Sequence, residues 1–344
     1  MNARTRVIEP PSFAEATRTF ARIGILSFGG PAGQIALMHR ILIDEKGWLD
    51  EKRFLHALNY CMLLPGPEAM QLATYTGWLL HGVRGGLVAG LLFVLPGALF
   101  ITFLSALYLL YGQVTLVQGL LFGLKAAVLA VVVEALIKVA RRALRSAPLA
   151  LLAVAAFIAI AFVKMPFPLV IALAALVGAL GPRFGKGRAG RSEDTDPPAL
   201  PMPEWTQPTT RRFLLTLTVW LAIWFVPILA ILAWFGSGHV FADESLFFAK
   251  MAAVTFGGAY AVLAYVAQQA VEVYGWLKPD EMLTGLGLAE TTPGPLILVL
   301  VFVGFLGGAR LSGWEPLAGG LAGAAVTLWF TFVPCFLWIF IGAP

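Results

Sequence analysis

The chain has 344 residues, of which 59% are hydrophobic and only 12% are charged. Soluble globular domains carry roughly twice that charged fraction, so this class of protein is excluded. The apolar runs are continuous, whereas the strands of a membrane β-barrel are about 10 residues long and alternate apolar with polar side chains. The composition therefore predicts an all-α polytopic membrane protein.

Charge and cysteine content exclude further classes of function. The formal net charge is +5, an excess that Lys and Arg in cytoplasmic loops explain without a nucleic-acid partner. Cys61 and Cys335 both lie in apolar stretches, which argues against a disulfide framework or a thiolate metal site. We expect no cofactor and no bound metal. Residues 1–12 are polar and lack an apolar core, so we expect a cytoplasmic tail without a cleavable signal peptide.

The first half of the chain contains two apolar segments that helix-breaking residues interrupt. Residues 13–45 are broken at Gly29-Gly30-Pro31, and residues 54–81 are broken at Pro65-Gly66-Pro67. Proline removes a backbone donor and clashes with the preceding turn, so neither segment can be one continuous helix. The uninterrupted apolar segments that follow are 85–111, 114–140, 148–163 and 167–181.

The second half repeats this organisation after a polar stretch. Residues 182–212 are rich in charge and proline, which predicts a flexible cytoplasmic linker because such a composition cannot support a packed core. The apolar segments beyond it are 213–235, 245–273, 281–309 and 314–341. Two of them are again interrupted. We therefore predict about ten membrane segments, four of them broken.

Clusters of Lys and Arg predict how the chain is oriented in the membrane. Such clusters occur at 138–145, 183–191 and 211–212, and the positive-inside rule places all three in the cytoplasm. Following the segments back and forward from these clusters, the first half begins inside and the second half begins outside. Both termini are then cytoplasmic. The two halves are thus predicted to have inverted topologies.

A sequence element of the first half recurs 228 residues further along the chain. Residues 20–67 align without a gap with residues 248–295, and both copies contain Phe-Gly-Gly, Gly-Trp-Leu and Pro-Gly-Pro. Inverted repeats whose helices are interrupted at corresponding positions are typical of secondary transporters, whose sites lie near the middle of the membrane. We predict a first repeat with a helical hairpin over 13–181 and a second repeat over 213–344.

The helix breaks favour an anion-binding site. Pro31 suits the first position of a new helix, and the free N–H groups and dipole of a helix N-terminus attract an anion. Ser27 and Thr255 precede the two Phe-Gly-Gly breaks, where their hydroxyl groups would be able to donate to an oxyanion oxygen. Arg22 and Lys250 share one position in the repeat. A cation inside a membrane helix costs about 2.5–3.5 kcal/mol, which indicates a role for this pair.

Simpler interpretations stay open for some of these residues. The glycines would also permit close helix packing. Arg22 lies near the end of its segment and would be able to reach the interface, and Glu68 would cap the helix after Pro67. The predicted substrate-binding residues are Arg22, Ser27, Phe28, Gly29, Gly30, Gln34, Pro65, Gly66, Lys250, Thr255, Gly257, Gly258, Thr291, Thr292 and Gly294. The predicted coupling residues are Glu68 and Glu290, and no catalytic residue is expected.

These motifs resemble a known family. The chain resembles the chromate ion transporter family in the stretches SFGGPAGQ at 27–34, LNYCMLLPGPEA at 58–69, QLATY at 71–75, TFGGAY at 255–260 and GLAETTPGP at 287–295. The resemblance covers nearly the whole chain and includes both halves, as in the long two-domain type. It implies export of chromate from the bacterial cytoplasm across the inner membrane, chromate resistance, and coupling to protons or to sulfate exchange.

The sequence leaves four functions open. A chromate carrier with alternating access is the first, and a carrier for sulfate or another tetrahedral oxyanion is the second, because sulfate matches chromate in charge and shape. A passive anion channel is the third. A chromate-reducing enzyme is the fourth, although the sequence lacks a dinucleotide fingerprint and any haem or iron–sulfur spacing. The expected partners are the substrate anion and the lipid bilayer, with a homodimer left open.

Overall fold

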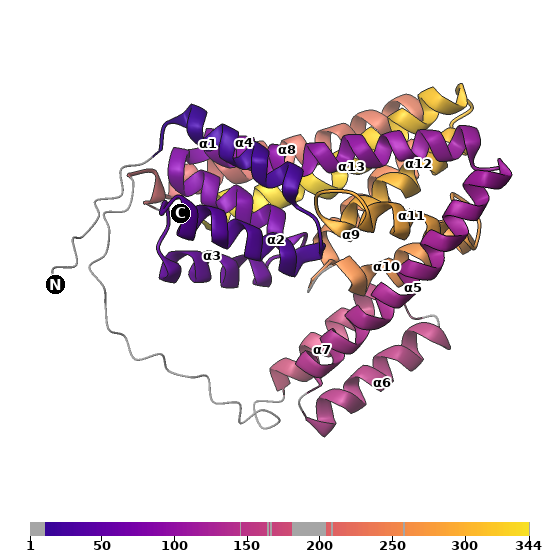
Figure 1. The fold of residues 1–344 in the computed structure, drawn as a ribbon, viewed down its shortest axis with the longest axis horizontal. Coiled ribbons are helices and arrows are strands. Elements are labelled where there is room, and N and C mark those ends of the chain that lie inside the picture. The colour runs from indigo at the N-terminus through magenta and orange to yellow at the C-terminus, as the bar shows by residue number, and fades with distance from the viewer. Residues whose placement is uncertain are drawn as a thin grey trace. The chain divides into compact units, whose positions relative to one another are not determined.

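A computed structural model describes residues 11–144, 146–163, 165, 167–180, 204–207, 209–256 and 259–343 (Figure 1). Within these residues every regular element is a helix, which confirms the all-α prediction. The predicted tail, apart from residues 11 and 12, and most of the predicted linker lie outside the described residues. The α-helices are α1 (Phe13–Leu26), α2 (Gly30–His39), α3 (Glu51–Leu63), α4 (Glu68–Tyr111), α5 (Thr115–Ala143), α6 (Ala147–Ala161), α7 (Phe167–Leu180), α8 (Thr210–Phe235), α9 (Val240–Val254), α10 (Ala259–Gln268), α11 (Glu281–Glu290), α12 (Val299–Leu311) and α13 (Pro316–Gly342). The short elements are the π-helical turns η1 (Arg40–Glu45) and η3 (Gln269–Val273) and the 3-10 turns η2 (Glu204–Thr206) and η4 (Leu296–Leu298).

The chain divides into two compact units. The first comprises Met1–Val128 and Pro203–Pro344 and contains both copies of the repeated sequence, residues 20–67 and 248–295. The second comprises Leu129–Met202, where α6 packs against α7. The helices in the described part of the chain that are long and apolar enough to cross a membrane are Glu68–Tyr111, Thr115–Glu134, Thr210–Phe235 and Pro316–Gly342. Their length and composition confirm a polytopic membrane protein.

All four predicted breaks interrupt the helices. They separate α1 from α2, α3 from α4, α9 from α10, and α11 from η4. Pro31 lies in the first turn of α2, and Pro67 and Pro295 directly precede α4 and η4. Gly66 and Gly294 adopt φ values of +117° and +94°, a backbone region that favours glycine. The Pro-Gly-Pro motifs therefore act as helix terminators.

The two repeats have the same order of elements. Each consists of a helix, a break, a helix that ends in a π-helical turn, the Gly-Trp-Leu connection, another helix, Pro-Gly-Pro and a helical hairpin. In the first repeat the hairpin is α4, whose backbone leaves the helical conformation at His81 and Gly82. In the second repeat it consists of α12 and α13. Glycines let the arms approach closely: a Cβ on Gly85 would overlap Gly77, and one on Gly319 would overlap Gly308.

The interrupted segments of the first repeat enter and return on the same face. Lys46, just after η1, places its Nζ 2.8 Å from Oε1 of Glu15 at the start of α1. The α1–α2 segment thus turns back at its break. The ring of His81, where the first arm of α4 ends, lies 5.4 Å from the ring of Phe13. We call the side with Phe13, Glu15, Lys46 and His81 the first face.

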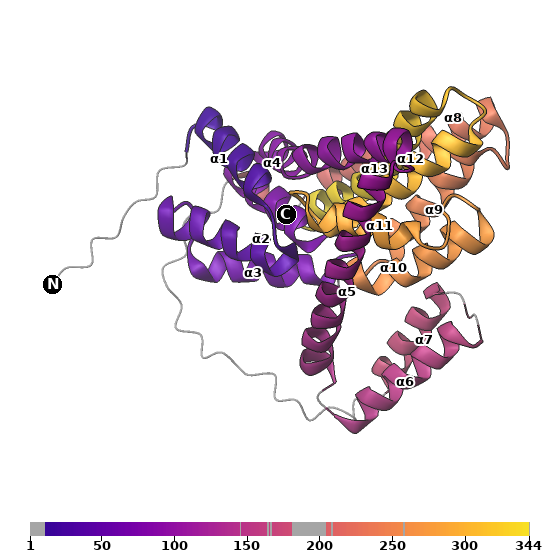
Figure 2. The same ribbon diagram turned by 45° about the vertical axis from the view of Figure 1, so that its right-hand side comes forward.

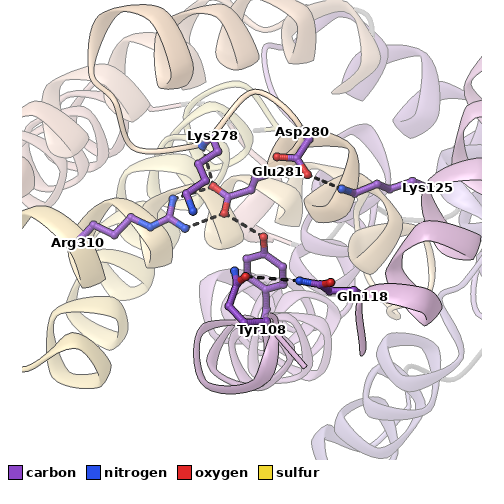
Figure 3. A network of polar contacts seen from close by, with 8 residues as sticks. Tyr108, Gln118, Lys125, Lys278, Asp280, Glu281 and Arg310 are labelled. Atoms are coloured by element: carbon purple, nitrogen blue, oxygen red, sulfur yellow. Dashed lines mark hydrogen bonds and ion pairs between the residues drawn. The ribbon is translucent and has the colours of Figure 1, made fainter. Parts of the chain in front are cut away.

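The second repeat begins at the opposite end of the spanning helices. Tyr108 lies near the far end of α4, and its hydroxyl donates to Glu281 Oε1 at 2.9 Å, at the start of α11 (Figure 3). Arg310 at the end of α12 donates to both oxygens of Glu281 at 2.7 Å, and the backbone N–H of Lys278 donates to Oε2 at 2.7 Å. We call this side the second face. The repeats enter from opposite faces, which confirms the inverted topology.

A second ion pair on this face lies nearer the surface. Lys125 of α5 donates to Oδ2 of Asp280 at 2.6 Å (Figure 3). The Asp280 side chain is 66% exposed. The hydrogen bond from Lys125 lowers the pKa of the Asp280 carboxyl, so the pair is charged at neutral pH.

Candidate functional site

The four helix breaks meet inside the first unit through two crossed hydrogen bonds. The N–H of Gly66 in the first repeat donates to the carbonyl oxygen of Thr255 in the second, at 2.8 Å. The N–H of Gly294 in the second repeat donates to the carbonyl oxygen of Ser27 in the first, at 2.7 Å. Each Pro-Gly-Pro motif is thus joined to the Phe-Gly-Gly break of the other repeat. Figure 2 shows the elements of both repeats, indigo and orange, approaching each other from the two sides.

A small cavity opens beside these crossed bonds. It is lined by the starts of three helical elements and by the end of α9. The lining residues are Pro31, Gln34, Gly66, Pro67, Glu68, Ala69, Thr255, Pro295, Leu296 and Ile297. The first N–H groups of α4 and η4 have no acceptor within their own helices. Helix N-termini with free N–H groups at a common cavity are suited to binding an anion.

Two buried glutamines support the breaks. Gln34 is 1% exposed and donates from Nε2 to the carbonyl oxygen of Gly294 at 2.6 Å and to that of Ser27 at 3.3 Å. Gln71 is 0% exposed and donates from Nε2 to the carbonyl oxygen of Pro65 at 2.8 Å. Gln34 therefore spans the two repeats, while Gln71 holds the first Pro-Gly-Pro. The Oε1 atoms of both glutamines are buried and lack a hydrogen-bond partner in the described part of the chain.

The hydroxyl groups of the predicted site residues were expected to donate to an oxyanion, but they donate to backbone carbonyl oxygens of their own helices. Ser27 donates to the carbonyl oxygen of Ile23 and Thr255 to that of Met251, both at 2.6 Å. Both bonds run back one helical turn. Thr291 and Thr292 also donate to carbonyl oxygens of α11. The reason is local: a Ser or Thr at the end of a helix reaches a carbonyl one turn back more easily than a distant group. In this conformation these hydroxyls offer only acceptor lone pairs.

The shared cations lie away from the cavity. Arg22 is exposed and forms an ion pair with Glu45 of η1 at 2.9 Å. Lys250 is exposed on α9, about one turn before the break. Neither residue lines the cavity. Their position in the two repeats is equivalent, but it is on the outer surface of α1 and α9.

The remaining predicted residues are distributed around the breaks. Glu68 lines the cavity, whereas Glu290 is the last residue of α11 and does not line it. Gly29 and Gly30 adopt φ values of +85° and +70°, and Phe28 beside them is exposed. Gly257 and Gly258 lie outside the described residues.

Some residues at the site were not among the predicted site residues. Ala69, Leu296 and Ile297 line the cavity, and a Cβ on Gly66 would lie 2.8 Å from Sγ of Cys335 on α13. Gln71 follows Pro67 by four residues, one turn into α4, and this spacing is a signal that the sequence did contain. The contact with Cys335 has no such signal because the two residues are far apart in the chain.

Comparisons with known proteins agree on one family. The profile of the chromate transporter family matches residues 14–179 and 243–344. The chromate transport protein of Pseudomonas aeruginosa is 32% identical over 340 residues, covering 97% of this chain and 74% of that protein. The probable chromate transport protein of Synechococcus elongatus is 28% identical over 97% of this chain and 76% of its own length. No solved structure matches. A profile match over both repeats, together with a relative of this identity and coverage, shows that the chain belongs to the chromate transporter family.

Proposed function

We propose that this protein is a secondary carrier that exports chromate from the cytoplasm, with the four helix breaks as its substrate site. The observation that carries the proposal is the junction of the breaks: helix N-termini from both repeats face one cavity, and two crossed hydrogen bonds link the repeats there. The repeats enter from opposite faces, so a rocking motion about this junction would open the cavity to either side in turn.

The distribution of charge supports a cytoplasmic first face. By the positive-inside rule, the side whose connections carry more Lys and Arg faces the cytoplasm. Among the described residues, those near the first face are Arg40, Lys46, Lys52, Arg53, Arg84, Arg211 and Arg212, and those near the second face are Lys125, Lys278 and Arg310. In this orientation both termini lie in the cytoplasm. The proposed location is the bacterial inner membrane.

Coupling is proposed to use the carboxyl groups near the breaks. Glu68 lines the cavity, and a negative charge there would repel a bound dianion. Protonation of Glu68 therefore favours anion binding. Glu290 at the end of α11 is the proposed coupling residue of the second repeat, although it does not line the cavity. Exchange with sulfate is the alternative mode of coupling. Both make use of the same cavity.

Transport by the purified protein tests this function. Proteoliposomes containing the full chain are expected to take up chromate with saturation, and excess sulfate is expected to inhibit the uptake because the two dianions have similar shape. Chromate uptake is measured against empty liposomes, and equal rates would rule out the carrier. Side-by-side uptake of chromate and sulfate decides between these two substrates. Accumulation against a gradient would exclude a passive channel, and a preparation with no visible cofactor spectrum would argue against a chromate reductase.

The two exposed cations are proposed to attract the dianion before it reaches the cavity. Arg22→Ala and Lys250→Ala are expected to raise the KM for chromate severalfold while the maximal rate changes little, since neither residue lines the cavity. Arg22→Lys retains the charge and serves as the matched control. Initial rates in proteoliposomes at low and high ionic strength provide the measurement. Wild-type KM in both alanine variants at low ionic strength would show that the cations are structural.

A further inference from the structure

Glu244 of α9 is a carboxyl group that the fold buries completely and, within the described residues, leaves without an ion-pair partner. It is 0% exposed, and neither carboxyl oxygen has a hydrogen-bond partner among the described residues. An ionised carboxylate in such surroundings is costly, because the backbone N–H of Gly308 only partly replaces the water that it loses. A neutral carboxylic acid is far less costly. Ionisable groups buried in membrane proteins are typical of proton or ion pathways.

The space around Glu244 is formed by glycines of the α12–α13 hairpin. A Cβ on Gly307 would lie 2.7 Å from Oε1 of Glu244 and 3.0 Å from the ring of Trp276, and one on Gly323 would lie 3.2 Å from the same oxygen. The carboxyl group thus fills a narrow slot between α9, α12 and α13. Water does not reach it in this conformation, and separation of α9 from this hairpin would expose it.

The first repeat builds the equivalent packing without an acid. Ala16 precedes Glu244 by 228 residues, the offset of the repeat, and it is 4% exposed. α1 packs mainly on α4, as α9 packs mainly on α13. A small apolar residue therefore satisfies this position of the fold. The carboxyl group of Glu244 needs another explanation than packing.

The charged groups on the neighbouring elements leave Glu244 without a counterion. On α9 itself the nearest ionisable neighbour is Asp243, which is also acidic, and Lys250 is exposed. On α12 the one charged residue, Arg310, is paired with Glu281. α13 contains no Asp, Glu, Lys, Arg or His. On α8 the charged residues are Arg211 and Arg212 at its exposed start.

We propose that Glu244 is a proton-binding residue of the second repeat, which holds a proton while α9 is packed on the α12–α13 hairpin and releases it to water when α9 separates. The site links the protonation state to the conformation of the second repeat. Its use to drive chromate transport rests on the proposed function. The binding of the proton itself does not.

Thermal unfolding of the detergent-purified full chain tests proton binding without any substrate. The folded protein holds this proton, whereas an exposed Glu in the unfolded chain loses it near pH 4.3. Stability contributed by the proton is therefore present at low pH and lost as pH rises. From about pH 5 upward, until the buried carboxyl group itself ionises, the wild-type Tm should fall by about 2 °C per pH unit relative to Glu244→Gln. Glu244→Met, which has a similar volume, should behave like Glu244→Gln and serves if that variant does not fold. Parallel curves for the wild type and either variant would overturn the proposal.

Transport assays test the coupling. In proteoliposomes with an imposed pH gradient, Glu244→Gln should lose most of the gradient-driven chromate accumulation, while chromate–chromate exchange remains because it needs no net proton movement. Asp243→Asn, a change at the neighbouring acid, is the control and should retain both. Loss of exchange and accumulation together in Glu244→Gln would overturn the coupling role. A wild type without any chromate transport would refute the proposed function instead, and the unfolding curves would still decide whether Glu244 binds a proton.

Discussion

Replacing Gly66 with alanine is expected to reduce chromate transport by about tenfold or more. Two effects combine at this position. The φ value of +117° is unfavourable for any residue with a side chain, and the new Cβ would lie 2.8 Å from Sγ of Cys335 and 3.1 Å from Nε2 of Gln71. The backbone must shift, which lengthens the bond from the Gly66 N–H to Thr255. We expect a loss of stability of about 1–3 kcal/mol as well.

Gly313 provides the matched control for this substitution. It lies in the α12–α13 connection and adopts a φ value of +73°, and a Cβ at this position would meet no heavy atom within 4 Å. Gly313→Ala therefore carries only the conformational penalty, about 1 kcal/mol. Chromate uptake and Tm are measured for both variants in parallel. Transport in Gly66→Ala equal to that of Gly313→Ala would contradict the role given to the first Pro-Gly-Pro break.

Glu281→Ala is expected to destabilise the protein by about 3 kcal/mol, the loss typical of a buried ion pair that keeps one partner. The Glu281 side chain is only 3% exposed, and it accepts hydrogen bonds from Arg310, Tyr108 and the N–H of Lys278 (Figure 3). Without the carboxylate, the Arg310 guanidinium stays half-buried and loses its ion-pair partner. The contact between the end of α4 and the second repeat is lost with it.

The neighbouring ion pair offers a direct comparison. Asp280→Ala removes the partner of Lys125, but the Asp280 side chain is 66% exposed, so the expected loss is at most about 1 kcal/mol. Both variants are compared with the wild type by thermal unfolding in detergent. Equal destabilisation by the two substitutions would mean that burial does not determine the contribution of these pairs.

The architecture was predictable because its signals are local in the sequence. Proline and glycine determine where a helix stops wherever they occur, so the breaks at residues 29–31 and 65–67 and their copies were confirmed. The constant offset between the copies revealed the repeat, and the Lys and Arg clusters indicated that the two halves have inverted topologies. Whether the broken segments span or return could not be predicted. The path of these segments depends on contacts such as the ion pair between Lys46 and Glu15. In the sequence, each of these residues has many other possible partners of opposite charge.

The details of the site were less predictable because they depend on distant partners. Gln34 is recognisable in the sequence as a polar residue near a break, but its acceptor, the carbonyl oxygen of Gly294, lies 260 residues away. The sequence also could not indicate whether Ser27 points into the cavity or back to its own helix, since both are sterically accessible. Glu244 stands in the sequence only as an acid near Lys250. Its burial becomes apparent only when the glycines of α12 and α13 are packed against it.

At the proposed substrate site, the crossed hydrogen bonds have a consequence for affinity. Gly66 lines the cavity. In this conformation its N–H already donates a hydrogen bond to the carbonyl oxygen of Thr255. An oxyanion that binds this N–H has to displace that oxygen, so the protein supplies its own competing ligand. The measured free energy of anion binding then reflects the difference between two hydrogen bonds to the same N–H, one accepted by the anion and one accepted by the Thr255 carbonyl oxygen. Loosening the junction between the repeats would strengthen binding of the anion, and tightening it would favour release.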